Sequence, residues 1–432
     1  MLSVLLIVVA VLGGRGSSDS SVASLPPKSE INRIAFVGLD AHIHTVDPDG
    51  SHPRSISSGT GAFTWPTWSP DGRGLVFSGV AEDETGNLRT SLLAFDGASG
   101  DVTELFLGEP GVRGLLAEGV VHYPLWSPDS TRVAFIAFTS EGLSLFLDDV
   151  RDSAGPVFVM DQGPLWMSWS PDSQYLLVHR GADHFLVNTL EGIRVNDLGV
   201  RAVGYRVPAW KPQGGIITLA RGVGPDRYTI LNARVVGNGL DDPEPITFLR
   251  EIGFPLAPAF LWSPSGELLA LSGSTRPVMY LGQPLMVYRD LALFSDSPKA
   301  QTLLIQDNVI AYFWSPDGDR LAYVAPSRTA SALRWVVVNA ADGERWPLVD
   351  FVPSRDQLTM FRFFDQYAYS HSLWSPDSGS LVFAGRLVDD ATAASAHYSL
   401  ARQESHIIVV DTNPEPLTYI IADGTLGFWS PR

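Results

Sequence analysis

The chain has 432 residues, of which 45% are hydrophobic and 18% charged, so it can build a large core and lacks the composition of a disordered protein. Thirty Lys and Arg against 47 Asp and Glu give a formal net charge of -17, which disfavours nucleic acid and anionic lipid as partners. The absence of cysteine excludes disulfides, thiolate metal sites and a cysteine nucleophile.

The first residues resemble a secretory signal. Residues 2–12 form an apolar run, followed by a small, polar stretch that contains Ser21-Val22-Ala23, where a cut after Ala23 is expected. The first basic residue, Arg15, follows the run instead of preceding it, and a functionless terminus is the alternative. The run is shorter than the roughly 20 residues that a stable membrane span needs. We therefore predict an extracytoplasmic protein, periplasmic or secreted, with a leader at 1–23, a linker at 24–33 and one domain at 34–432.

One short string recurs along the domain. Its eight copies begin at Trp68, Trp126, Trp169, Trp210, Trp262, Trp314, Trp374 and Trp429, and most read W-S-P-D-G or W-S-P-D-S. Successive copies lie 58, 43, 41, 52, 52, 60 and 55 residues apart, close to the length of one four-stranded propeller blade. The sequence therefore predicts a repeat protein.

The string itself predicts a hairpin turn, because Ser, Pro and Gly stand where a type I turn prefers them. An apolar, β-rich run follows most copies, for example Leu75-Val76-Phe77 and Leu321-Ala322-Tyr323. A catalytic acid would be unique and not periodic. The recurring acids are therefore interpreted as turn residues: Asp71, Asp129, Asp172, Asp317 and Asp377.

The two ends complement each other. Strands expected at 34–37 and 43–46 have no W-S-P turn before them, whereas Gly427-Phe428-Trp429-Ser430-Pro431 has the turn with no strand after it. We predict an all-β, eight-bladed β-propeller of four-stranded antiparallel blades, closed by N- and C-terminal strands that share one blade. The repeat resembles that of TolB-type, WD40-like propellers over residues 34–432. This resemblance implies a fold and only a class of function.

The connections on one face of the predicted ring hold the long insertions, including residues 351–372, and binding residues are often placed on such loops. The position three residues before the repeat Trp is expected to enter the central channel from that face. Several of these positions hold aromatic residues or His, and further aromatic and Arg residues lie nearby in the sequence. Together they predict a funnel that stacks on a sugar ring or binds a peptide. Its candidate lining is Trp65, Tyr123, Trp166, Arg206, Phe260, Tyr312, Arg362, Tyr369 and His371. Rings that merely fill the space between blades are the alternative.

The sequence favours a non-enzymatic recognition protein with a protein or glycan ligand and no cofactor, because it has no G-x-S-x-G elbow. The alternative is a carbohydrate-active lyase or hydrolase that uses His371 with Asp365 or the pair Asp389-Asp390. His42 and His44 share one strand face, but no third metal ligand is apparent nearby, so we interpret them as surface or packing residues. The oligomeric state is not predicted.

Overall fold

The computed structural model describes residues 32–431, apart from 109–121, 153, 191, 202–207, 225–226, 242–243, 251–257, 274, 282, 296–302, 329–331 and 389–403. The predicted leader and nearly all of the linker lie outside the described residues. Within them, no helix is long and apolar enough to cross a membrane.

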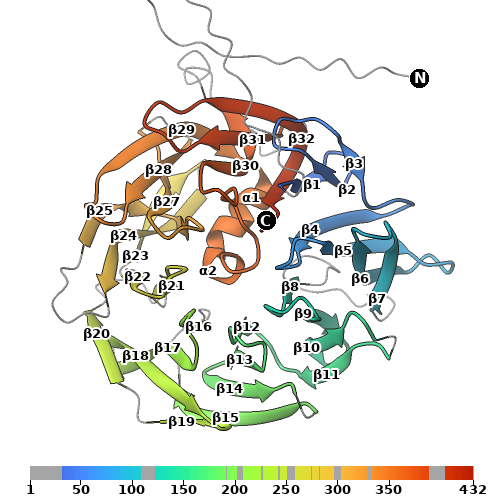
Figure 1. Cartoon of the computed structure of the whole chain (residues 1–432), viewed down its shortest axis with the longest axis horizontal. Coiled ribbons are helices and arrows are strands. Elements are labelled where there is room, and N and C mark those ends of the chain that lie inside the picture. The colour runs from blue at the N-terminus through green and yellow to red at the C-terminus, as the bar shows by residue number, and fades with distance from the viewer. Residues whose placement is uncertain are drawn as a thin grey trace, which may run out of the picture.

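The described chain is almost entirely β, and its antiparallel sheets lie around a common centre (Figure 1). Three sheets have four strands: β4 (Ala62–Trp68), β5 (Gly74–Glu82), β6 (Leu88–Asp96) and β7 (Val102–Leu107); β8 (His122–Trp126), β9 (Arg132–Thr139), β10 (Gly142–Asp149) and β11 (Val157–Met160); β12 (Leu165–Trp169), β13 (Tyr175–Arg180), β14 (Asp183–Asn188) and β15 (Arg194–Arg201). Two sheets have five strands: β16 (Ala209–Trp210), β17 (Ile216–Gly224), β18 (Arg227–Val236), β19 (Gly239–Leu240) and β20 (Glu244–Arg250); β21 (Ala259–Trp262), β22 (Leu268–Ser272), β23 (Thr275–Tyr280), β24 (Gln283–Ser295) and β25 (Leu303–Val309).

The remaining strands form one continuous ten-stranded sheet that joins the two ends of the chain. Its order is β26 (Ala311–Trp314), β27 (Arg320–Pro326), β28 (Leu333–Asn339), β29 (Arg345–Pro353), β30 (Ser380–Leu387), β31 (His406–Asp411), β32 (Thr418–Trp429), β1 (Ile34–Gly38), β2 (Ile43–Val46) and β3 (Arg54–Ser55). β1 pairs with β32, with Ile34 opposite Trp429 and Val37 opposite Leu426. The first and last strands therefore lie side by side.

The second strand of each sheet is buried over long stretches. β5, β9 and β27 each bury five consecutive residues, 75–79, 133–137 and 321–325. A continuous apolar run of this kind suits a strand that is covered on both faces. Because successive strands run in opposite directions, the repeat turns lie at one end of the sheets, here called the turn face. The second-to-third-strand connections and the links between sheets lie at the other end, the loop face.

The repeat string forms the turn that the sequence predicted. In the first copy, the Gly72 N–H donates to the Ser69 carbonyl at 2.8 Å, and the Asp71 carboxylate accepts from the Ser69 hydroxyl at 2.6 Å and the Arg73 N–H at 3.1 Å. Gly72 adopts φ 72°, in the left-handed region that favours glycine. The Asp carboxylate is thus bonded within its own turn.

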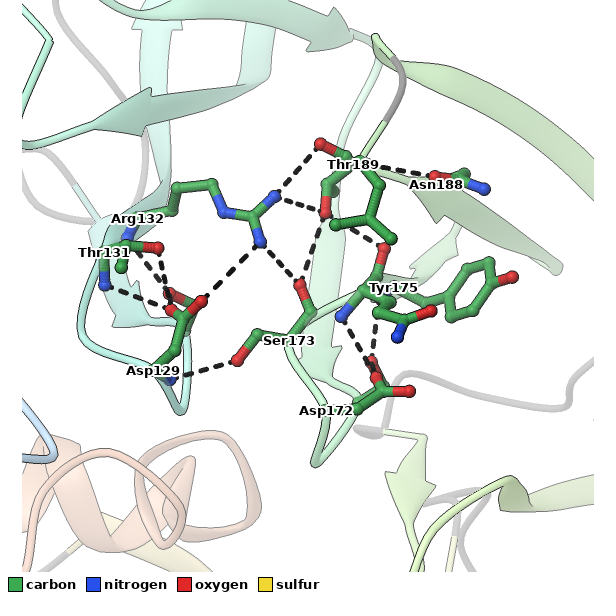
Figure 2. A network of polar contacts seen from close by, with 12 residues as sticks. Asp129, Thr131, Arg132, Asp172, Ser173, Tyr175, Asn188 and Thr189 are labelled. Atoms are coloured by element: carbon green, nitrogen blue, oxygen red, sulfur yellow. Dashed lines mark hydrogen bonds and ion pairs between the residues drawn. The ribbon is translucent and has the colours of Figure 1, made fainter.

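Some copies place serine at that left-handed position, and each such serine joins two sheets. Ser173 has φ 63°, and its hydroxyl accepts the Asp129 N–H of the preceding sheet at 3.0 Å. Arg132 crosses the same junction, donating to the Ser173 carbonyl at 2.7 Å and to the Thr189 hydroxyl at 2.6 Å (Figure 2). Arg320 makes the equivalent contacts with Ser378 and Thr412. The turn face therefore holds sheets together by hydrogen bonds.

The repeat tryptophans also connect neighbouring sheets. In six described copies the indole N–H donates to the carbonyl of the residue just before the previous repeat tryptophan: Trp68 to Phe428, Trp126 to Thr67, Trp169 to Leu125, Trp210 to Ser168, Trp314 to Leu261 and Trp374 to Phe313. Trp262 donates instead to the Thr218 hydroxyl, at 2.8 Å. Seven of the eight repeat tryptophans thus bond to the sheet before them, whereas the indole N–H of Trp429 has no hydrogen-bond partner among the described residues.

Candidate functional site

Two short helices, α1 (Arg355–Arg362) and α2 (Phe364–Tyr367), lie at the centre of the circle of sheets (Figure 1). Ser354 caps α1, because its hydroxyl accepts the Gln357 N–H at 2.9 Å and donates to the Thr425 carbonyl. The Gln357 side-chain oxygen accepts the Ala384 N–H at 3.0 Å. These bonds tie α1 to β30 and β32. We call residues 355–367 the central helices.

Aromatic rings join the central helices to the inner strands β4, β8, β12 and β26. The ring pairs, with centroid distances, are Tyr367 with Trp65 at 4.5 Å, Tyr367 with Tyr123 at 5.1 Å, Phe363 with Trp166 at 5.9 Å and Phe364 with Tyr312 at 4.6 Å. The first pair is parallel within 3°. On this side, the centre of the circle of sheets is therefore filled by aromatic side chains of the chain itself.

The backbone is strained where two of these rings enter the centre. Trp65 and Tyr123 have φ values of 54° and 52°, which bulky residues rarely adopt. Both sit at irregularities in strand register, between Thr64 and Thr67 and between His122 and Leu125. Strain of this kind costs about 1–3 kcal/mol per residue. Packing of both rings against Tyr367 offsets that cost.

The structure does not form the open funnel expected from the sequence. Six of the nine proposed lining residues are only 0–8% exposed: Trp65, Tyr123, Trp166, Phe260, Tyr312 and His371. Five of them pack around the central helices, whereas Phe260 belongs to a cluster between the fourth and fifth sheets. Arg362 and Tyr369 are exposed, and Arg206 lies outside the described residues. These rings are enclosed because helices fold back over them from the 351–372 insertion, and the prediction that they bind a ligand stays a prediction.

His371 is a buried fixing point between the central helices and the first sheet. Its ring nitrogens lie 2.9 Å from the Thr67 hydroxyl and 2.7 Å from the Ser370 hydroxyl. The ring packs edge-on against Tyr367 and Phe428, at 5.1 Å and 4.5 Å. Burial lowers the pKa of His371 to about 3. The imidazole is therefore neutral near pH 7 and enclosed, which suits packing better than proton transfer to a substrate.

Asp365 lies in a buried polar cluster with three tyrosines. The hydroxyls of Tyr123 and Tyr367 are hydrogen-bonded to each other, and the Tyr369 hydroxyl accepts the Trp262 N–H at 3.3 Å. Burial, and secondly the charge of Asp365, raises the pKa of Tyr123 and of Tyr369. The phenols stay protonated at neutral pH. The carboxylate predicted as a catalytic acid is thus enclosed, and Asp389 and Asp390 lie outside the described residues.

The outward side of α1 is basic. Arg355 and Arg362 are exposed, Thr359 between them is half-exposed, and neither guanidinium has a hydrogen bond or ion pair with another described residue. Tyr369, which follows α2, is 42% exposed even though its hydroxyl end is bonded inside. Arg355 and Thr359 were not among the residues that the sequence singled out.

The two histidines of β2 and its preceding turn have local partners. His44 Nε2 lies 3.0 Å from both carboxylate oxygens of Asp40, and His42 Nδ1 lies 3.0 Å from the Ser57 hydroxyl. Among the described residues, no group of three His, Asp or Glu side chains is arranged to hold a metal ion.

Comparison with solved structures matches this chain to β-propeller proteins at low identity. TolB from Acinetobacter baumannii is 13% identical, with 73% of this chain and 65% of that chain covered and a TM-score of 0.37. The β-propeller domain of the Trilobed protease from Pyrococcus furiosus is 10% identical, with coverage of 83% and 98% and a TM-score of 0.44. A eukaryotic initiation factor is 12% identical, with coverage of 94% and 99% and a TM-score of 0.53.

No protein-family model matches the chain, and no curated protein matches it. At these low sequence identities, the structural matches give information about the fold alone. The four-stranded antiparallel sheets are consistent with a β-propeller, and TolB is among the structural neighbours.

Proposed function

We propose that this protein is a non-enzymatic recognition module, located outside the cytoplasm, that binds a protein segment on its loop face. The observation that supports this most is the enclosure of the centre by the central helices. It leaves the outward side of α1 and the ring of Tyr369 as the surface that a partner would meet there. The location rests on residues 1–23 of the sequence alone.

The same enclosure of the centre disfavours a glycan ligand, and it also disfavours lyase or hydrolase activity. Sugar recognition would use exposed rings for stacking, yet Trp65 and Trp166 are buried. Lyase or hydrolase chemistry would need Asp365 and His371 to reach a substrate, and both are enclosed. A protein segment needs only the exposed surface.

Photo-crosslinking tests this function. A benzophenone amino acid at Thr359, on the loop face, is expected to capture a reproducible partner from an extracytoplasmic extract, competed by excess unlabelled protein. The matched control places the same group at Asp342, exposed in the turn between β28 and β29 on the turn face. Capture that is equal from both positions, or stronger from Asp342, would contradict the loop-face assignment.

We also propose that the sheets form a closed ring of eight blades of the TolB type, with β32, β1, β2 and β3 as the closing blade. Three contacts support closure: the β1–β32 pairing, the bond of the Trp68 indole to the Phe428 carbonyl, and the bond of the Ser430 N–H to the Arg33 carbonyl at 2.8 Å. The second of these continues the tryptophan pattern of the other sheets across the junction.

Hydrogen exchange tests the closure. In a closed ring, amides of residues 34–37 and 426–429 are expected to exchange within about tenfold of the rate in the buried strand β9, because terminal strands that are paired on both sides do not fray. Exchange of both segments at the rate of an exposed loop would show an open ring. A crystal structure with a different number of sheets would overturn the blade count.

A further inference from the structure

The outward side of α1 presents two arginines in a regular arrangement. Arg355 and Arg362 are seven residues apart, which places them on one side of the helix at about 10.5 Å along its axis. The opposite side is buried through Gln357, Met360 and Phe361. The helix is therefore fixed to the core by one side and offers two cations at a set spacing on the other.

These arginines differ from many others in the described chain, which are paired with acids. Ion pairs join Arg33 to Asp47, Arg132 to Asp129, Arg201 to Asp183, Arg320 to Asp317, Arg334 to Asp350 and Arg386 to Glu404. Arg355 and Arg362 have no such partner among the described residues, in a chain whose net charge is -17. Two unpaired guanidinium groups at the centre of one face are suited to an anionic partner.

We propose that Arg355 and Arg362 bind two carboxylates of a short acidic peptide segment that lies along α1. This rests on the proposed function and names the chemistry of its partner. Two separated carboxylates would let each arginine pair with its own anion, whereas one phosphate would have to draw both side chains toward each other. A long polyanion would extend over the acidic remainder of the surface and be repelled by it. A short segment avoids that repulsion.

The spacing also sets the pattern of the segment. A peptide in the polyproline II conformation has three residues per turn and rises about 3.1 Å per residue, so carboxylates three residues apart lie on one side at about 9.3 Å, close to the arginine spacing of about 10.5 Å. We therefore expect a Glu-x-x-Glu segment to bind better than one with adjacent acids.

The test uses a fluorescein-labelled hexapeptide with glutamate at positions two and five, titrated with the full chain and followed by anisotropy at 20 mM and 200 mM NaCl. Wild-type protein is expected to bind it saturably and more weakly at high salt. The Arg355→Gln/Arg362→Gln double variant should bind about fivefold to tenfold more weakly, as expected for loss of two exposed ion pairs. The matched control, Arg151→Gln/Arg194→Gln, removes two exposed arginines from the turn face and should leave binding unchanged.

Several outcomes overturn the proposal. They are no saturable binding at 20 mM NaCl, equal binding by the two double variants, and equal binding of a hexapeptide with glutamine at both positions. Binding of an oligouronic acid in place of the peptide would assign a glycan and also overturn it. If crosslinking from Thr359 still succeeds in those cases, loop-face recognition stands and only the acidic partner is wrong.

Discussion

Replacing Phe361 by alanine is expected to lower the free energy of unfolding by about 3–5 kcal/mol, the usual cost of truncating a buried aromatic ring. Phe361 is fully buried, and its ring contacts Phe313, Trp335 and Phe351 at centroid distances of 6.4, 5.6 and 6.3 Å. These partners belong to β26, β28 and β29. Loss of the ring would leave a cavity between α1 and three strands.

Guanidinium denaturation of wild type and variant measures this effect as a shift in midpoint at constant slope. The matched control is Phe158→Ala, because Phe158 is 52% exposed on the outer strand β11 and its loss should cost less than about 1 kcal/mol. If Phe361→Ala cost no more than Phe158→Ala, the central helices would not belong to the cooperative core. The enclosure of the centre, on which the proposed function depends, would then have to be abandoned.

The sequence predicted the repeating part of the fold and missed what fills its centre. The recurring tryptophans and aspartates could be interpreted because most copies make the same local contacts, a hydrogen bond within the turn or one to the preceding sheet. The central helices occur once, so they could not be predicted from repetition in the sequence. A local signal was present: Ser354 followed three residues later by Gln357, with Leu358 and Phe361 at helical spacing, is typical of a helix start.

The position of the central aromatic residues could be predicted from the repeat, but their exposure could not. Trp65, Tyr123 and Trp166 do point to the centre, as their position before the repeat tryptophan indicated. Their exposure depends on whether the distant 351–372 insertion folds inward or outward, which the inner strands cannot reveal. The positive φ values of Trp65 and Tyr123 were equally beyond prediction, because they depend on packing against Tyr367.

The stability of the wild type is expected to fall with acid more steeply than that of a His371→Gln variant. The pKa of His371 is lowered from 6.5 to about 3 in the folded protein. Between these two pH values the unfolded chain binds a proton at His371 and the folded chain does not. The stabilisation is complete above pH 6.5 and is lost progressively as the pH falls toward 3. At pH 4 this shift corresponds to about 3 kcal/mol.

Other groups titrate in the same range, so the comparison is between two proteins and not between two pH values alone. Burial lowers the pKa of His184 to about 4, which adds to acid destabilisation, whereas burial and then Asp149 raise the pKa of Asp148 to about 6, which opposes it. Both groups are present in wild type and variant and cancel in the difference. Glutamine can still bond to the Thr67 hydroxyl but does not titrate.

The measurement is chemical denaturation of both proteins at pH 7, 6, 5 and 4. The difference in unfolding free energy between them should be constant above pH 6.5 and should shift by about 3 kcal/mol against the wild type by pH 4. Parallel curves would mean that His371 can accept a proton in the folded state. The imidazole would then be accessible, and the enzymatic use of His371 that its burial disfavours would regain support.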